Sequence, residues 1–382
     1  MRGRKRAIIV GGGPGGLAAA IALRRVGIDP IVFERASDIR QSGSGLTLWP
    51  NAMKALGRLQ LAEAVQSASF QSEGIAMRSW RGELLFSVES HDQAEILGGV
   101  HGYALHRAEL ISVLLKAFGE DSVKRGFRCL GYRQDKTGVT VFFDNGLTVC
   151  GDALIGADGI RSVIRTQLVG KTTLKYAGYT VWRGVTQFKL PGKVGLTTMG
   201  RGAQFGLFPM TRNRVYWFAS VNAPEGSPDW ATGRKSELLE RFKGWHEPIE
   251  AIIEATNESN ILRNDIYDHE PLSTWSNGHA TLLGDAAHPS TPNLGQGACQ
   301  AFEDAIVLAT CLREEQEIGS ALKAYESRRI QRTSAITLQS RRLGQMGRWK
   351  NPVLCWFRDK LIKSIPEQVR LRQLNAVFNF DG

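Results

Sequence analysis

The segment AIIVGGGPGGLAAAIAL, residues 7–23, decides the fold of this chain. It begins with a short apolar, β-branched run, continues through a glycine-rich turn, and then places apolar side chains on one face of a helix that ends at Gly27. A second apolar run at residues 30–33 closes on Glu34. Strand, glycine-rich turn, helix and strand within roughly 30 residues make a βαβ unit, which predicts a Rossmann-type parallel sheet.

The glycine spacing predicts what the turn binds. In Gly11-x-Gly13-x-x-Gly16, the first glycine permits the tight turn, the second lets the backbone approach a pyrophosphate, and the third lets helix and sheet pack closely. Glu34 can accept both ribose hydroxyls of an adenosine. Arg35 would suit a 2′-phosphate, but the adjacent carboxylate would repel one. The motif predicts dinucleotide binding without separating NAD from FAD.

Length, charge and cysteine usage restrict the classes of protein that fit this chain. A chain of 382 residues is long enough for two or three domains, and it contains no run of about 18 apolar residues. Five scattered cysteines without a C-x-x-C pair are typical of a reducing cytoplasm. The net charge of +11 would suit nucleic acid, an anionic membrane or an acidic small molecule. Aromatic and basic residues do not interleave as in an RNA-binding sheet, so we expect no nucleic-acid partner.

The pattern beyond residue 100 predicts that the nucleotide-binding fold is interrupted. Expected elements are a helix at 105–118, a hairpin at 139–150, buried strands at 153–156 and 280–283, an antiparallel sheet at 178–222, and helices at 236–254 and 298–312. We therefore expect an α/β fold in which a β-rich domain interrupts a Rossmann-type domain. Its expected parts are a nucleotide-binding domain at 1–70, 100–172 and 273–340, a β-rich substrate domain at 71–99 and 173–272, and a C-terminal helical segment at 341–382.

A second glycine-rich segment, residues 284–297, separates FAD from NAD. It follows a predicted strand and leads into a helix. Asp285 supplies an acceptor for ribityl hydroxyls, and the glycine-rich helix N-terminus supplies the positive potential that a reduced flavin needs near N1 and the C2 carbonyl. The alternative is an aspartate that only caps its own loop. We expect His288 to be a hydrogen-bonded structural residue rather than a base.

With these motifs in order, the sequence resembles the class A flavoprotein aromatic hydroxylases, the group with p-hydroxybenzoate hydroxylase, salicylate hydroxylase and zeaxanthin epoxidase. The resemblance covers about residues 6–335, and it includes the family's D-G motif at 156–165. It implies noncovalent FAD, NADH or NADPH as electron donor without a separate domain for it, and O2 carried as a flavin C4a-hydroperoxide. The cofactor-binding candidates are Gly11, Gly13, Gly16, Glu34, Arg35, Gly45, Arg107, Cys129, Asp158, Asp285, Pro292, Leu294, Gly295 and Gly297.

The resemblance also indicates where a substrate would lie. It places residues 42–51 beside the isoalloxazine and Pro292 near the reactive C4a. Gln204, Phe208 and Tyr216 are pocket candidates, although each aromatic side chain could equally be core. We name Pro292, Tyr216 and Gln204 as the catalytic candidates. No charged substrate anchor is evident at 199–217, which argues against a small aromatic acid and favours a lipophilic or aromatic substrate.

The resulting prediction is an FAD-dependent monooxygenase that hydroxylates or epoxidises a small molecule. Neither H-E-x-x-H nor a Cys/His cluster with zinc spacing occurs, so no metal is expected. Two alternatives stay open. One is a flavin oxidase or reductase that inserts no oxygen, and the other is a flavin-binding regulator without turnover.

The C-terminal segment carries most of the excess charge, with nine Lys/Arg against three acids between residues 341 and 382. Residues 353, 354, 357, 361 and 362 give one apolar helical face, with Arg358, Lys360 and Lys363 on the polar side. Such a helix could contact an anionic membrane peripherally, or pack onto the nucleotide-binding domain. We therefore expect a cytoplasmic protein and leave both roles of this helix open.

Overall fold

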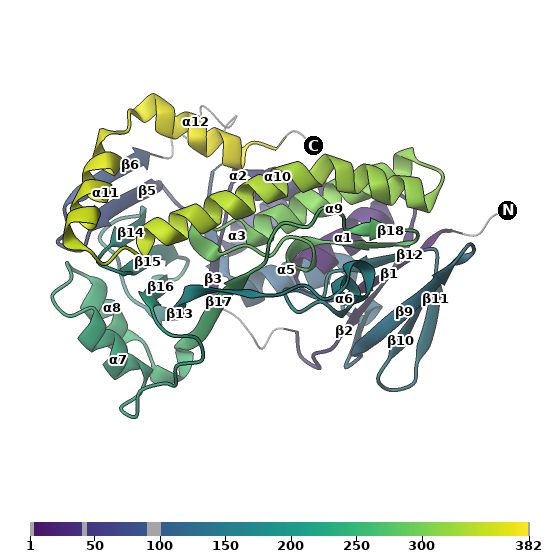
Figure 1. The fold of residues 1–382 in the computed structure, drawn as a ribbon, viewed down its shortest axis with the longest axis horizontal. Helices are drawn as coiled ribbons and strands as arrows, with labels where there is room; N and C mark the ends of the chain where they lie inside the picture. Colours follow the sequence, from purple (N-terminus) through teal and green to yellow (C-terminus); the bar gives the residue numbers. More distant parts are fainter. Residues whose placement is uncertain (1–3, 40–43, 90–100, 381–382) are drawn as a thin grey trace.

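The computed structural model describes residues 4–39, 44–89 and 101–380, so the parts of the predictions that fall on residues 1–3, 40–43, 90–100 and 381–382 lie outside it. Two sheets stand at opposite ends of an elongated molecule, and helix α10 (Ile318–Gly347) runs between them (Figure 1). This is the predicted fold class, a Rossmann-type α/β domain with a β-rich second part.

The nucleotide-binding end is built on a six-stranded sheet. Its strands, in order across the sheet, are β18 (Ser276–Asn277), β19 (Ala280–Leu282), β12 (Ala153–Gly156), β1 (Arg6–Val10), β2 (Asp29–Glu34) and β8 (Val123–Arg125). All neighbouring pairs are parallel except β18–β19. The strand at 153–156 is confirmed, and the one predicted at 280–283 ends one residue earlier. Because parallel strands end at the same edge, Val10, Glu34, Gly156 and Leu282 bring their following loops together.

Both faces of this sheet are covered, which explains its continuous apolar strands. Ala7 and Ile9 pack against helices α1 (Pro14–Arg25), α5 (Arg107–Phe118) and α9 (Gly297–Glu314). Ile8 and Val10 face the three-stranded sheet of β9 (Cys129–Asp135), β10 (Gly138–Phe143) and β11 (Thr148–Gly151), with α6 (Val163–Val169) beside it. The predicted hairpin is confirmed as β10–β11. The helix predicted at 105–118 begins at Arg107, because His106 is its N-cap.

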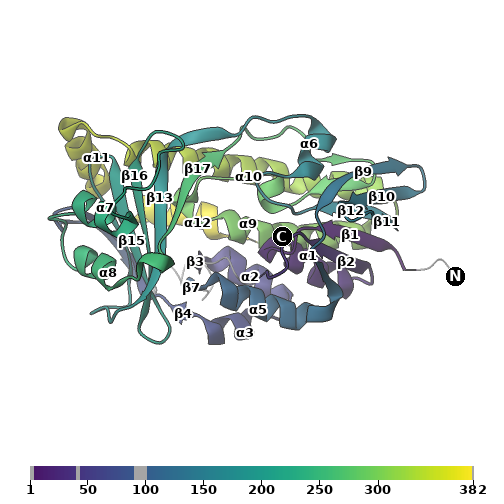
Figure 2. The same cartoon turned by 90° about the horizontal axis from the view of Figure 1, so that it is seen from below.

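The β-rich end is a seven-stranded sheet. Its order is β17 (Leu262–Asp268), β13 (Lys175–Gln187), β16 (Arg214–Asn222), β15 (Ala203–Met210), β14 (Gly195–Met199), β5 (Gly74–Ser79) and β6 (Leu84–Glu89). The antiparallel sheet expected within 178–222 is confirmed in β13 to β16. One face carries Trp182, Phe205 and Trp217, which α7 (Arg234–Arg241) and α8 (Ile249–Ala255) cover (Figure 2). The other face turns toward the nucleotide-binding end.

The single helix predicted at 236–254 is wrong, because the chain forms α7 and α8 with a break between them. Gly244 adopts φ +75°, and Pro248 can neither donate a helical hydrogen bond nor allow a helical residue before it. The helix predicted at 298–312 is present as α9, slightly longer at both ends.

A small sheet and two helices lie between the two ends. Their bounds are β3 (Gly45–Leu48), β7 (Tyr103–His106), β4 (Phe70–Gln71), α2 (Pro50–Arg58) and α3 (Ala62–Ala68). From these sheets we propose the domain division that the sequence predicted, including its C-terminal segment.

The C-terminal segment forms α11 (Pro352–Ser364) and α12 (Glu367–Phe378). In helix α11 the apolar face is exposed, and a residue that we expected on the polar side is buried. Arg358 is only 1% exposed and donates to the Gly200 carbonyl at 3.2 Å, so its placement on the polar side was wrong. Val353 is 70% and Phe357 57% exposed, so the apolar face does not pack onto the nucleotide-binding domain. Among the described residues, no helix is long and apolar enough to cross a membrane.

Candidate functional site

The glycine turn between β1 and α1 combines two packing requirements with one open space. A Cβ on Gly11, which has φ +113°, would lie 2.2 Å from the Ala157 carbonyl oxygen, and one on Gly16 would lie 1.9 Å from the Gly11 oxygen. A Cβ on Gly13 would meet no atom within 4 Å. Gly13 is also the N-cap of α1, which has no side-chain cap. The turn thus leaves a helix N-terminus facing open space, which fits a pyrophosphate.

Glu34 and Arg35 lie at the end of β2, beside this turn. The Glu34 carboxylate accepts hydrogen bonds from Gly12 N and Ala36 N, both at 2.8 Å. Each oxygen keeps a lone pair, so the carboxylate can still accept ribose hydroxyls. Arg35 is exposed to solvent.

Asp158 lies in the loop after β12, and Arg165 lies in α6, the helix that follows this loop. Hydrogen bonds within this segment hold both side chains. Asp158 Oδ2 accepts from Val163 N at 2.8 Å, while its Oδ1 is buried without a partner in the described part of the chain. Burial raises the pKa of Asp158. Arg165 is buried and donates to the Ala286 carbonyl at 3.1 Å, so it ties this loop to the 284–297 segment. The orphaned oxygen is an acceptor available to a ligand.

Cys129 lies at the start of β9 in the core that covers this sheet. Burial raises the pKa of its thiol to about 11. It therefore stays a protonated, apolar group at neutral pH, and any contribution to cofactor binding would come from its position near Asp158 rather than from a thiolate.

Asp285 follows β19 and is the central acceptor of the site. Its side chain keeps exposed surface, yet burial raises its pKa against the charges of His288, Arg107 and Arg165. We call the accessible space beside Gly13, Asp285 and Gly297 the recess. Arg107, the first residue of α5, acts on the same recess. An enclosed carboxylate with accessible surface fits the hydroxyls of a ribityl chain.

Residues 292–297 form the loop that connects the region around Asp285 to the N-terminus of α9. Pro292 is exposed, Leu294 half-buried, and Gly295 adopts φ +62°. A Cβ on Gly295 would lie 2.7 Å from Trp49 Nε1, and one on Gly297 would lie 3.7 Å from Asp285 Oδ1. Helix α9 has no side-chain cap. The buried donors Trp49 Nε1 and Gln296 Nε2 have no partner among the described residues.

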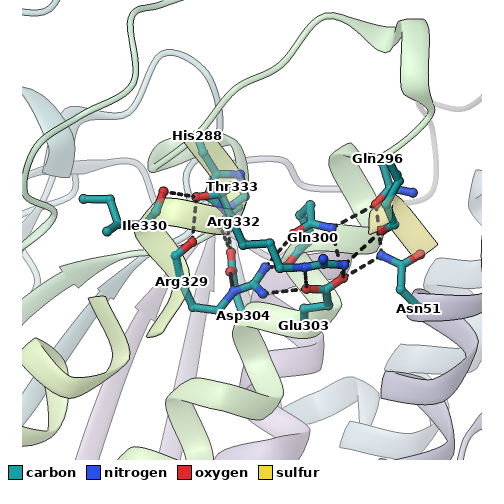
Figure 3. A network of polar contacts seen from close by, with 12 residues as sticks. Asn51, His288, Gln296, Gln300, Glu303, Asp304, Arg329, Ile330, Arg332 and Thr333 are labelled. Carbon is teal, nitrogen blue, oxygen red and sulfur yellow. Dashed lines mark hydrogen bonds and ion pairs between the residues drawn. The ribbon is translucent and has the colours of Figure 1, made fainter. Parts of the chain in front are cut away.

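A buried ionic network supports this loop from below, and sequence reasoning missed it (Figure 3). Asp304 accepts from Gly284 N at 3.0 Å, from His288 Nε2 at 2.7 Å and from Arg329 Nε at 2.7 Å. His288 is thus the structural residue that was expected. The signal was present in the sequence, since two adjacent acids interrupt an otherwise apolar buried helix.

Glu303 extends the same network toward α2 and the C-terminus. It accepts from Asn51 Nδ2 at 2.6 Å and from Arg332 Nε at 2.8 Å. Asn51 also donates to Gln296 Oε1 at 2.9 Å, and Arg332 donates to the Val377 carbonyl at 2.9 Å. The network therefore fixes the entry to α9 against helices that are distant in sequence.

The three catalytic candidates lie where the recess meets the seven-stranded sheet. Asn293, next to Pro292, donates to the Tyr179 hydroxyl of β13 at 3.0 Å. Tyr216 packs over Gly45, where a Cβ would lie 2.2 Å from the ring carbon Cγ. Gln204 lies against Gly347 near Tyr179 and Asn293, in a small cavity. The structure brings Gln204 close to the Pro292 loop and Tyr216 close to Gly45.

These features fit FAD better than NAD, because acceptors and helix N-termini continue from the glycine turn to residue 297. Within the described residues, no group of three or more His, Cys, Asp or Glu could hold a metal ion.

Comparisons with known proteins identify the family of this chain. The family described as "FAD binding domain" matches residues 4–340. Aurachin C monooxygenase/isomerase from Stigmatella aurantiaca is 43% identical over 359 residues, covering 93% of this chain and 93% of that protein. FAD-dependent urate hydroxylase from Klebsiella pneumoniae is 34% identical over 361 residues, covering 93% of this chain and 94% of that protein. The crystal structure of Klebsiella pneumoniae HpxO complexed with FAD and uric acid superposes with a TM-score of 0.93 and 32% identity, covering 99% of this chain and 97% of that one.

Proposed function

Because the chain belongs to the FAD binding domain family of class A flavin monooxygenases, it is an FAD-dependent monooxygenase, and we propose that it oxygenates a lipophilic or aromatic ring compound with NADH or NADPH as electron donor. Bound FAD supplies the redox chemistry, taking electrons from the nicotinamide and activating O2.

The observation that carries this proposal is the arrangement of the loops. The glycine turn and the Asp285 loop follow parallel strands at one sheet edge, and a Cβ on Gly297 would lie 3.7 Å from Asp285 Oδ1. Asn293, in the same loop, donates to Tyr179 of the second sheet at 3.0 Å. A cofactor held along these loops would present its reactive end to that sheet.

The chain's own residues would position the cofactor, shield the reacting face from water and stabilise negative charge. We propose that Asp285 holds the ribityl hydroxyls and that Gly11, Gly13, Gly16, Glu34, Arg35, Arg107, Cys129 and Asp158 border the adenosine and pyrophosphate end. Gly45, Pro292, Leu294, Gly295 and Gly297 would border the ring, where the N-terminus of α9 favours negative charge. Aromatic side chains from β15 and β16, among them Phe208 and Tyr216, would exclude water from the reacting face.

The test is the mass of the product. Incubation of the FAD-loaded protein with NADH or NADPH, isotopically labelled O2 and a panel of ring compounds should give a product that has gained one labelled oxygen atom. Product altered without labelled oxygen would instead indicate an oxidase or reductase. No change in any compound, with FAD bound, would indicate a regulator.

We also propose a cytoplasmic protein that contacts membranes peripherally through α11. Val353, Leu354, Trp356, Phe357 and Leu361 turn their side chains outward, each at least 46% exposed. The inward positions are held by Cys355 and by Arg358, whose guanidinium bonds to backbone carbonyls. An outward apolar face with Trp and Phe needs a partner of its own.

Charge favours an anionic lipid surface as that partner. Lys360 lies over the Trp356 ring at 5.9 Å, and Lys350 is exposed just before the helix. Each basic residue near such a surface contributes about 1 kcal/mol. Full-length protein should sediment with phosphatidylserine-containing vesicles at low salt and less at high salt.

The variant Trp356→Ser/Phe357→Ser should stay in the supernatant, whereas Leu130→Ser, at an exposed apolar position outside α11, should sediment like wild type. Wild-type protein that stays in the supernatant with vesicles at low salt would contradict the membrane contact and leave the monooxygenase proposal intact. Self-association lost in the double variant would identify a second copy of the chain as the partner instead.

A further inference from the structure

One arginine on the sheet face that turns toward the cofactor recess has no hydrogen-bond or ion-pair partner among the described residues. In β13, alternate residues share a face, so Tyr179, Val181, Arg183 and Val185 project to one side. Trp182 projects to the other side, into the core under α7 and α8. Because Tyr179 bonds to Asn293, the side that carries Arg183 faces the 292–297 loop.

The strand register places aromatic side chains around Arg183. Residues directly opposite in an antiparallel pair share a face, and β13 pairs Arg183 with Phe218 and Val185 with Tyr216. The next pair adds Phe208, opposite Tyr216, and Gln204, opposite Ser220. Arg183 therefore lies among Val, Phe and Tyr side chains. Arg214, at the end of β16 on the same face, is already paired with Glu109 at 2.8 Å.

Two polar groups on this face have no partner in the part of the chain that the structure describes. Arg183 is half-buried, and its guanidinium makes no hydrogen bond or ion pair within residues 4–39, 44–89 and 101–380. The Tyr216 hydroxyl likewise has no hydrogen-bond partner in those ranges, although Tyr216 is only 9% exposed. Burial raises the pKa of Tyr216, and the charge of Arg183 opposes that rise, so the two side chains are near each other.

A half-buried guanidinium in apolar surroundings is costly unless an acceptor meets it. Tyr216 packs on Gly45 at the cofactor recess, so a ligand at this face would lie between the sheet and the recess. We propose that Arg183 is the specificity-determining residue that binds an anionic oxygen of the substrate, a carboxylate, phenolate or enolate on an aromatic ring. This rests on the proposed monooxygenase function and deepens it by naming the substrate class.

The proposal also changes an expectation from the sequence. The sequence showed no evident charged anchor within residues 199–217, and we propose that the neighbouring strand β13 supplies one. The aromatic side chains around Arg183 would bind the ring, and the guanidinium would select rings that carry an anion.

Benzoate and methyl benzoate test this, because they differ in charge but share the ring. Each is titrated into the FAD-loaded protein, and binding is followed by the change in the flavin absorption spectrum. Wild type should bind benzoate more tightly than the ester. Arg183→Met should weaken benzoate binding by about tenfold or more and leave the ester unchanged, because a hydrogen bond to a charged group is lost. Arg183→Lys should lie between the two.

The matched control is Arg201→Met, which removes the same charge from the exposed turn between β14 and β15. It should bind both compounds like wild type. Wild type that binds benzoate no better than methyl benzoate would overturn the proposal. So would an Arg183→Met variant that weakens both compounds equally, or that loses FAD or thermal stability, since that pattern belongs to a structural arginine.

The outcome is independent of turnover. A protein that discriminates benzoate through Arg183 but transfers no labelled oxygen to any compound would keep the anchor and lose the proposed function. A protein that oxygenates a neutral compound while Arg183→Met has no effect would keep the proposed function and remove the anchor.

Discussion

Asp304 of α9 and Arg329 of α10 form an ion pair of 2.7 Å in which neither side chain is more than 2% exposed. Arg329 also pairs with Glu303 at 2.5 Å, so one guanidinium compensates two buried carboxylates. Since Asp304 accepts from Gly284 N, this pair determines where the loop that carries Asp285 begins. The stability of the fold and the shape of the cofactor recess therefore depend on the same contact.

Arg329→Met should destabilise the protein strongly. It leaves Asp304 without its guanidinium partner and Glu303 with Arg332 alone, and removing one member of a buried pair costs about 3–5 kcal/mol. Urea unfolding of the FAD-loaded protein measures the change. Arg328→Met, which breaks an exposed pair with Glu314, is the control and should cost less than about 1 kcal/mol. Equal midpoints for the two variants would contradict the role given to Arg329.

Asp304 should also make the protein sensitive to acid. Burial alone would raise the pKa of Asp304, but His288 and Arg329 outweigh it and lower the pKa to about 2 from 3.8. A carboxyl whose folded pKa is depressed contributes stability above its unfolded pKa and loses it as pH falls toward the folded value. We expect a loss of about 2 kcal/mol between pH 4 and pH 2.

Asp304→Asn is the comparison for this acid effect. It should be less stable at neutral pH and should lose less stability than wild type over the same acid range. Denaturant unfolding at a series of pH values gives both curves. Parallel curves for wild type and variant would show that Asp304 does not titrate with folding.

Asp285→Ala should weaken FAD binding more than Glu34→Ala. Asp285 lies in the enclosed recess, so its loss would leave ribityl hydroxyls unmet at about 1–3 kcal/mol, or about 5- to 150-fold in Kd. Glu34 already accepts from Gly12 N and Ala36 N, so it has fewer lone pairs to offer a cofactor and its loss should cost less. Asp285→Asn keeps an acceptor and should lie between wild type and Asp285→Ala. Flavin release followed by fluorescence measures all three, and equal losses from both alanine variants would count against this placement of the cofactor.

Local chemistry explains what the sequence could predict. Gly11 and Gly16 are required by the turn itself, and Asp285 follows a strand whose end must reach the same sheet edge. The face that an element buries is a different matter, since it depends on distant partners. The periodicity of α11 predicted an apolar face but not that Arg358 would be the buried side.

The seven-stranded sheet shows the same limit. Both of its faces are rich in apolar residues, so alternation along β13 did not reveal that Trp182 enters the core while Arg183 faces the recess. The network around Arg329 was missed for a related reason, because its members are distant in sequence and meet only when α9 and α10 pack.

The contact between Gly45 and Tyr216 gives a last prediction, which separates packing from cofactor binding. A Cβ on Gly45 would lie 2.2 Å from Tyr216 Cγ, so Gly45→Ala must displace a buried ring and should cost about 1–3 kcal/mol. Gly57→Ala in α2 is the control, because a Cβ there meets nothing within 4 Å, and it should stabilise the helix by up to about 1 kcal/mol.

The double variant Gly45→Ala/Tyr216→Ala decides why Gly45 is a glycine. If the ring alone requires it, the double variant should be more stable than the sum of the two single changes, by about 0.5–3 kcal/mol in a double-mutant cycle, with FAD content restored. If the flavin requires it, the coupling free energy of unfolding in this cycle should be near zero. The double variant should then still bind FAD poorly, because the added methyl group occupies the recess. Purely additive effects with unchanged FAD content would show that neither the ring nor the flavin approaches Gly45 as closely as the structure indicates.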